Sequence, residues 1–296
     1  MKLFHIATWL KLCGFAAACL GAVASRPAAA AETAAGPDFV TGIGGWQIND
    51  AEPGGNSVDF HMVPGELVGP MTYDVKHPYV SNLDAFKRMP APRIAELNNP
   101  ILQPWARDII KATNDDVLAT GKFPFTSEQR CWPGGVPGLL VYPGRFYYIQ
   151  KPNEVWFINE RDHQIRRIYL NVPHQTNPGF SWYGDEIGHY QNGDTLAIDT
   201  IGLDDKGPID NYRTPHTRQL HVTETQQLDS GRTRIFMNIM VDDPGAFTTP
   251  WKAWKVFKRT GGPRPVVWDE VVCAENNPDY FDERPVAMPH ADRLDF

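Results

Sequence analysis

The sequence predicts a mainly β protein in which an antiparallel meander closes into a barrel, with one amphipathic helix ahead of it. From Cys131 onward, short stretches rich in β-branched and aromatic residues are separated by Pro-Gly, Asn-Gly and Gly-Gly turns. Before them, apolar residues recur at helical spacing from Leu102 to Leu118, and the pattern stops at Gly121. With 296 residues, 42% of them hydrophobic, the chain can bury a substantial core.

Eight runs show the side-chain period of two that is typical of strands. They cover residues 146–150, 155–159, 165–170, 195–200, 219–224, 233–241, 252–258 and 266–273. Because tight turns join most of them, the runs favour an antiparallel barrel. The dipeptide Asn192-Gly193 is a hairpin signal between residues 188–190 and 195–200.

The first 31 residues have the pattern of a secretory signal peptide. Two lysines precede a small apolar run, and cleavage is expected after Ala31, so a periplasmic or secreted protein is predicted. A lipoprotein anchor at Cys19 is the alternative, and it is disfavoured because Ala16 stands where a leucine is expected. No other run approaches the roughly 18 apolar residues of a membrane span.

The remainder divides into an irregular segment, 32–94, and a helix plus β-barrel domain, 95–296. Residues 32–58 are rich in Ala, Gly, Pro and Asn without periodicity, so we expect them to lie on the surface and to add nothing to the core. Loss of the signal peptide removes three basic and no acidic residues, which takes the net charge from −7 to −10. Nucleic acids and anionic membrane surfaces are therefore not expected partners.

Asp199 is a carboxylate in an otherwise apolar strand. Leu196, Ile198 and Thr200 share one face of that strand, whereas Ala197 and Asp199 share the other. The second face is either the solvent side or the floor of a ligand cavity in the barrel. In the cavity, desolvation would raise the pKa of Asp199 and make it a useful base.

Several motifs in the second half resemble those of a known family. They are GDTLAIDT at 193–200, DNYRTPHT at 210–217, LHVTE at 220–224, DDPGAF at 242–247 and Cys-Trp-Pro-Gly at 131–134. The same order is found in a large family of secreted bacterial proteins, mostly of unknown function, with GDTLVVDT, DNYRTPHT, LHVVER and DDPGAF. The chain departs from that pattern at Gln191-Asn192, where one acidic residue is usual, and at Thr225, which replaces an arginine.

The resemblance covers roughly residues 95–296 and implies a lipocalin-like β-barrel. It also carries an association with the phenylcoumaran γ-formaldehyde lyases of lignin-degrading bacteria, which act on aromatic dimers without a cofactor. The expected partner is thus a small hydrophobic or aromatic ligand.

The loop before residues 219–224 concentrates chemically active side chains. Tyr212 can donate to an oxyanion, Arg213 with Asn211 can bind a phenolate or carboxylate, and His216 has the pKa range for acid–base work. The structural alternative is that Asp210 pairs with Arg213 to fix the loop while His216 caps a backbone group.

Aromatic side chains are abundant, with 9 Trp, 10 Tyr and 15 Phe. Trp182 and Trp251 lie in or beside predicted strands, where they can stack on an aromatic ligand or simply fill the barrel core.

Other histidines and acids have weaker signals. His216, His221 and Glu224 lack the spacing of a zinc site, so no metal is predicted. His174 is expected to be a turn residue, and Glu224 to form a structural salt bridge. A nucleophile elbow, a phosphate loop and a dinucleotide fingerprint are all missing from the sequence, so no cofactor is predicted.

The sequence therefore favours a cofactor-independent periplasmic lyase or isomerase that acts on a small, lignin-derived phenolic dimer. His216, Asp199 and Tyr212 would be catalytic, and Arg213, Asn211, Trp182 and Trp251 would bind the substrate. The alternative is a lipocalin-like periplasmic protein that binds a hydrophobic molecule without catalysis.

Cys131 and Cys273 are the two cysteines that remain after export, and we expect one disulfide between them. The alternative is two separate buried thiols. A bond across this long loop is worth roughly 4–5 kcal/mol in the chain-entropy model. Intact mass after alkylation without reductant should show no labelled thiol on the secreted protein, and two labels would exclude the bond.

Overall fold

A computed structural model describes residues 36–40, 44–48, 59–78, 93–120, 127, 131–142 and 144–261. It contains one α-helix of 17 residues, α2 (Pro104–Thr120), and two short 3-10 helices, Gly138–Val141 and Arg161–His163. The strands are β1 (Trp46–Ile48), β2 (His61–Met62), β3 (Arg145–Lys151), β4 (Glu154–Asn159), β5 (Ile165–Leu170), β6 (Asp185–Gln191), β7 (Thr195–Ile201), β8 (His221–Leu228), β9 (Arg234–Asp242) and β10 (Trp251–Arg259).

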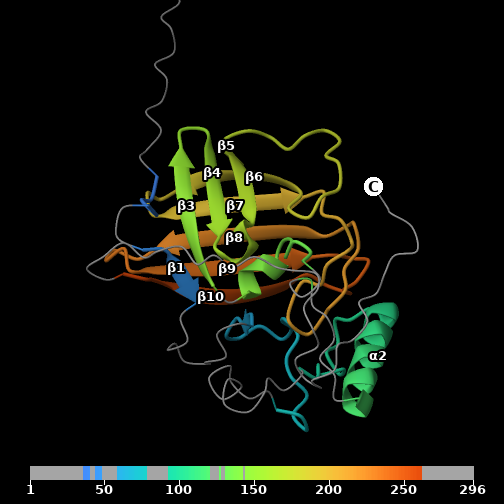
Figure 1. Cartoon of the computed structure of the whole chain (residues 1–296). Helices are drawn as coiled ribbons and strands as arrows, with labels where there is room; N and C mark the ends of the chain where they lie inside the picture. The colour runs from blue at the N-terminus through green and yellow to red at the C-terminus, as the bar shows by residue number, and fades with distance from the viewer. Residues whose placement is uncertain are drawn as a thin grey trace, which may run out of the picture. The chain divides into compact units, whose positions relative to one another are not determined.

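The strands form a closed barrel of nine, which confirms the predicted barrel although the sequence showed eight runs (Figure 1). β3 to β10 are neighbours in chain order, and β1 pairs with both β3 and β10, which closes the ring. β2 adds to β10 outside the ring. The predicted hairpin is confirmed, since Asn192 and Gly193 both have positive φ, at 53° and 74°, as a type I′ turn requires.

One pairing in the ring is parallel. β5 and β6 run in the same direction and share only two residue pairs, Tyr169 with Ile187 and Leu170 with Gly188. The long connection 171–184 makes this possible, because parallel neighbours need a crossover rather than a tight turn. The barrel is therefore not a pure antiparallel meander.

The N-terminal segment corrects one expectation. Residues 32–58 were expected to add nothing to the core, yet Phe39 and Trp46 are each only 1% exposed. The Trp46 indole N–H donates to the Phe39 carbonyl at 3.1 Å, and the Phe39 ring stacks on Tyr148 at 4.7 Å. Trp46 belongs to β1, which has only three residues and is too short to show a period of two in the sequence. Its pairing with β3 and β10 fixes its place.

The other expected elements are found with shifted ends. The helix predicted over 102–118 is α2, and the run predicted over 219–224 is the longer strand β8. α2 buries Ala106, Ile110 and Val117, and Asn114 exchanges hydrogen bonds with the Ala95 backbone at 2.9 and 3.0 Å. The strand predicted over 266–273, with Cys273 in it, lies outside the described residues, so the disulfide stays a prediction.

The barrel interior is filled by side chains. Phe146 stacks on Phe157 at 4.3 Å and meets Phe257 edge-on at 4.9 Å. Leu196 from β7 and Ile239 from β9 are also buried. Alternate residues of each strand therefore form the core, and the residues between them form the outer face.

Trp46→Ala should lower the free energy of unfolding by about 3–5 kcal/mol, because it removes a large buried side chain from the strand that closes the ring. Val40→Ala is the matched control, since Val40 is 48% exposed, and its effect should stay within about 0.5 kcal/mol. Urea denaturation measures both, and equal effects would contradict a closing role for β1.

Candidate functional site

Asp199 lies on the outer face of β7, not in the barrel interior. Leu196, Ile198 and Thr200 fill the interior and are 0–3% exposed, whereas the Asp199 side chain is 39% exposed. In the sheet register, Asp199 lies between Ile187 of β6 and Thr223 of β8. The interior position considered for Asp199 is thus wrong, because the strand alternates and its bulkier face is the one that packs.

Asp199 binds two histidines on the outer face. His174 Nε2 and His221 Nε2 both contact Asp199 Oδ1, at 2.9 and 2.8 Å. His174 Nδ1 contacts Asp185 Oδ2 at 2.9 Å. The four side chains form a continuous chain, Asp185 to His174 to Asp199 to His221, contributed by β6, the connection 171–184, β7 and β8.

His174 is held by a carboxylate at each ring nitrogen, so both nitrogens act as donors when the ring is protonated. Partial burial lowers the pKa of His174, but the hydrogen bonds and negative charges of Asp199 and Asp185 outweigh it and raise the pKa above its ordinary value. Partial burial likewise raises the pKa of Asp185, but bonds from Gln175 and His174 outweigh it and lower that pKa. His174, which was expected to be a turn residue, lies in the connection 171–184 and there links the carboxylates of Asp185 and Asp199.

His221 has the geometry of a general base. If its Nε2–H donates to Asp199, the other ring nitrogen, Nδ1, carries the lone pair. Its side chain is 38% exposed, and it lies two residues from Thr223 along β8. A base oriented by a carboxylate is the arrangement on which acid–base and nucleophilic sites are built.

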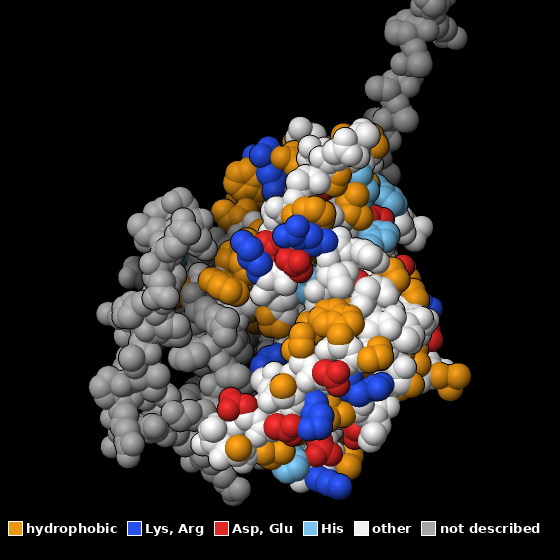
Figure 2. Space-filling model, turned by 90° about the vertical axis from the view of Figure 1, so that its right-hand side faces the viewer, with side chains coloured by type: hydrophobic (Ala, Val, Ile, Leu, Met, Phe, Trp, Pro, Cys, Tyr) orange, Lys and Arg blue, Asp and Glu red, His pale blue; other side chains and the backbone are white. Residues whose placement is uncertain are grey.

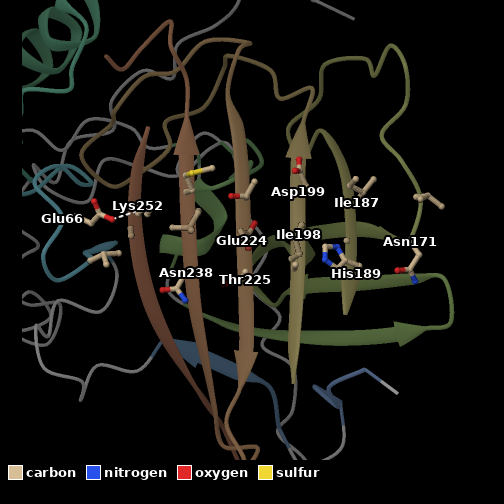
Figure 3. A pocket seen from close by; sticks show the side chains of 18 residues that line it. Glu66, Asn171, Ile187, His189, Ile198, Asp199, Glu224, Thr225, Asn238 and Lys252 are labelled. Atoms are coloured by element: carbon tan, nitrogen blue, oxygen red, sulfur yellow. Dashed lines mark hydrogen bonds and ion pairs between the residues drawn. The ribbon is translucent and has the colours of Figure 1, made fainter. Parts of the chain in front are cut away.

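A groove of about 780 Å³ borders this chain on the outer face of β6 to β10 (Figure 3). One cross-strand row runs along it: Ile187, Asp199, Thr223, Met240 and Lys252, each opposite the next in the sheet register. Further lining comes from Val63, Glu66, Asn171, Val172, His189, Ala197, Thr225 and Asn238. The walls thus combine apolar side chains with hydroxyl, amide and charged groups, as in sites for small organic molecules.

The side chains of the predicted loop 210–217 have structural roles. The Tyr212 hydroxyl and the Asn211 amide both donate to the Asp59 carboxylate, at 3.1 and 3.0 Å. Arg213 donates to the Arg93 carbonyl at 2.8 Å, and burial lowers its pKa to about 10. Burial raises the pKa of Tyr212 far above its ordinary value. These three side chains therefore bind other parts of the chain and do not line the groove.

Asp210 fixes this loop, but not through the expected pair with Arg213. Its carboxylate accepts from the backbone of Tyr212 and Thr214 and from the Thr214 hydroxyl, at 2.7 to 3.1 Å.

The remaining predicted site residues are not brought to the groove either. His216 is 8% exposed, with Nδ1 3.1 Å from the Thr217 carbonyl, and it lines a small hollow together with Trp182. Trp251 is 2% exposed in the core and packs edge-on against Phe247 at 6.0 Å. Of the predicted catalytic residues, only Asp199 belongs to the His–Asp chain.

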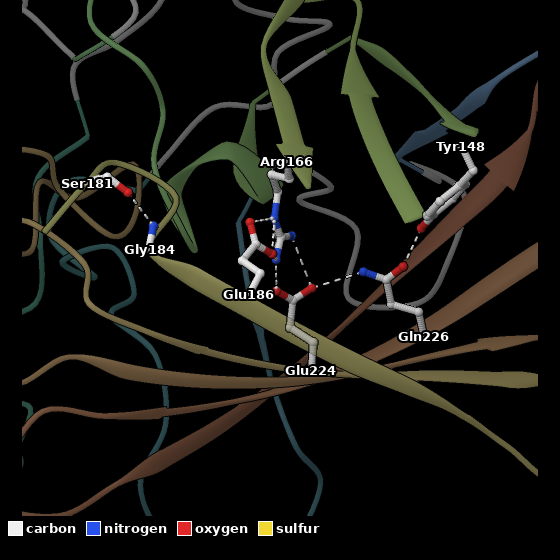
Figure 4. A network of polar contacts seen from close by, with 7 residues as sticks. All are labelled: Tyr148, Arg166, Ser181, Gly184, Glu186, Glu224 and Gln226. Atoms are coloured by element: carbon white, nitrogen blue, oxygen red, sulfur yellow. Dashed lines mark hydrogen bonds and ion pairs between the residues drawn. The ribbon is translucent and has the colours of Figure 1, made fainter. Parts of the chain in front are cut away.

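A second polar network lies inside the barrel (Figure 4). Arg166 donates to Glu186 and to Glu224, both at 2.6 Å, and all three side chains are at most 1% exposed. Gln226 donates to Glu224 at 3.0 Å and accepts from the Tyr148 hydroxyl. The salt bridge expected of Glu224 is confirmed, and the hydrogen bonds of these side chains to described residues stay within the network.

Within the described part of the chain, no group of three or more His, Cys, Asp or Glu residues is arranged to hold a metal ion. No helix in the same residues is long and apolar enough to cross a membrane. On the face in Figure 2, basic and acidic side chains are interspersed, without the single-sign surface that nucleic acids require.

No family model matches the chain, and no curated protein matches it significantly.

Sequence reasoning missed His174, His221 and Asp185 as partners of Asp199. The signal was present in part, because His221 and Thr223 fall on one face of β8 and Asp199 on the outer face of β7. Only the register that sets Asp199 opposite Thr223 brings His221 within reach, and a single sequence does not give that register.

Asp185→Asn should lower the pKa of His174, because it removes one of two carboxylates that stabilise the imidazolium. Since folding raises this pKa, His174 contributes stability that is complete below about pH 6.5 and is lost as the pH rises through the folded value. Titration of the His174 ring by NMR tests this, with Glu66→Gln as a distant control. An unchanged pKa of His174 in Asp185→Asn would contradict the stabilisation of its imidazolium by both carboxylates.

Proposed function

We propose that the protein is a cofactor-independent acid–base enzyme, a lyase or isomerase, that acts on a small organic molecule in the outer groove. His221 is the base, and Asp199 orients it. One observation carries the proposal: a single carboxylate oxygen holds His174 and His221 at 2.9 and 2.8 Å beside a groove of about 780 Å³. His221 therefore replaces His216 in the mechanism expected from the sequence.

The His–Asp chain supports reversible proton transfer. Asp199 holds the Nε2–H of His221 and stabilises the imidazolium that forms when Nδ1 accepts a proton from substrate. His174 bonds the same oxygen of Asp199 and holds it in place, and His221 returns the proton in the second half of the reaction. Thr223 and Thr225 line the groove on the same strand and can hydrogen-bond to a substrate hydroxyl.

The resemblance to secreted bacterial proteins suggests phenylcoumaran-type dimers as substrates. In such a dimer, His221 would take the proton of the hydroxymethyl group, and the carbon–carbon bond to that group would break to release formaldehyde. The electron pair of that bond forms a carbon–carbon double bond as the ring carbon–oxygen bond opens. The phenolate so formed takes the proton from His221, so atoms and charges balance.

The alternative is a binding protein without catalysis, and the β-barrel fold is compatible with it. A lipocalin-like protein holds its ligand inside the barrel, but here the described interior is packed with aromatic rings and a self-contained charge network. A binder also needs no base held by a carboxylate. We further propose that the protein acts after export, on the basis of its signal-peptide pattern.

His221→Ala should lower kcat about 10²–10⁴-fold with little change in KM, because it removes the base and leaves the groove intact. His216→Ala is the matched control, since His216 faces the Thr217 carbonyl away from the groove, and it should change kcat only a few-fold. Formaldehyde release from a panel of lignin-type dimers is the assay. Circular dichroism checks that both variants fold.

Two outcomes would contradict the proposal. Unchanged turnover in His221→Ala would remove His221 as the base. Binding of the dimers without turnover by the wild-type protein would favour the binding alternative.

A further inference from the structure

Two charged groups line the groove three strands apart. Lys252 of β10 contacts Glu66 Oε1 at 3.0 Å, and Asp199 of β7 lies between Thr223 and Ile187 (Figure 3). His221, which Asp199 holds, is two residues from Thr223 on β8 and borders the groove. Among the described residues that line the groove, Lys252 is the only lysine or arginine. The two positions therefore offer different chemistry, a proton acceptor beside Asp199 and a cation at Lys252.

The sheet register fixes the distance between these two groups. Asp199, Thr223, Met240 and Lys252 lie opposite one another on β7, β8, β9 and β10. Neighbouring strands are spaced about 4.8 Å apart, so three spacings separate Asp199 from Lys252 by about 14 Å. A molecule that reaches both groups must have roughly the length of two linked rings.

Lys252 can exchange its partner at little cost. Its side chain is 57% exposed and that of Glu66 is 37% exposed, and exposed ion pairs contribute about 0–1 kcal/mol. An anionic group that enters the groove can therefore replace the Glu66 carboxylate on Lys252.

The backbone that carries Glu66 is held in place. β2 pairs with β10 through Met62 with Ala253 and His61 with Trp254, and the Trp254 indole N–H donates to the Met62 carbonyl at 3.0 Å. The segment that leads to Glu66 is thus anchored to β10.

We propose that the groove selects an elongated organic anion, with an apolar body and a carboxylate, phenolate or similar group at one end. Lys252 binds the anionic end, the body lies over Thr223 and Met240, and the reacting atom reaches His221. This assignment of substrate class rests on the proposed acid–base function for its reacting end only. The recognition of an anion by Lys252 is independent of turnover.

Two fluorescent probes test the anion site directly. The anion 8-anilinonaphthalene-1-sulfonate and neutral N-phenyl-1-naphthylamine share the same two ring systems and differ in the sulfonate. In the full-length protein, Lys252→Gln should weaken binding of the anion about tenfold, because it removes a charge-assisted bond. Glu66→Gln should strengthen it, because the competing carboxylate is gone. Neither change should alter binding of the neutral probe.

Lys258→Gln is the matched control, since Lys258 is on β10 but does not line the groove. Equal affinity of the anion for the wild type and Lys252→Gln would overturn the proposal, as would an equal loss for both probes. The His221 base is tested separately, by the loss of formaldehyde release in His221→Ala. Failure of the anion site and failure of the His221 base are therefore seen in different variants and different assays.

Discussion

The barrel depends on one buried guanidinium. Arg166 lies between Glu186 and Glu224 and joins β5 to β6 and β8, at the seam where β5 and β6 share only two residue pairs. Backbone pairing is short there, as it also is between β1 and β3, and the side chains add to the connection. Burial raises the pKa of Glu186, although the charge and the hydrogen bonds of the Arg166 guanidinium oppose it. Loss of Arg166 would leave two buried carboxylates without a cation, which typically costs 3–5 kcal/mol.

The same alternation that builds this interior also creates the outer site. Along β7 and β8, inward positions hold Ile198 and Glu224, and outward positions hold Asp199 and Thr223. The inner carboxylate is saturated by its partners, and it therefore has a structural role. The outer carboxylate binds two histidines at the edge of a groove, where solvent and small molecules have access. Two acids on paired strands thus differ in role because they face opposite sides of one sheet.

Much of the fold was predictable from sequence because its signals are local. Asn192-Gly193 encodes a type I′ turn by itself, and the alternation over residues 233–241 encodes a strand whichever partner it finds. β1 was missed because three residues carry no period, and the parallel contact of β5 with β6 was missed because it depends on the path of a long connection. Both are decided by neighbours that are distant along the chain.

The site shows the same division. The sequence by itself determined that Asp199 is a lone carboxylate on the less bulky face of a strand, and that Glu224 forms a structural salt bridge. It also placed Tyr212, Arg213 and His216 in one loop, but it could not show that the loop is satisfied by Asp59, Arg93 and backbone carbonyls. Only the tertiary structure decided that Asp199 faces outward and meets His174 and His221. The physical reason is that these side chains come within about 3 Å of one another only when the strand register and the path of a loop place them there. The residues that form the hydrogen bonds do not themselves encode that register or that path.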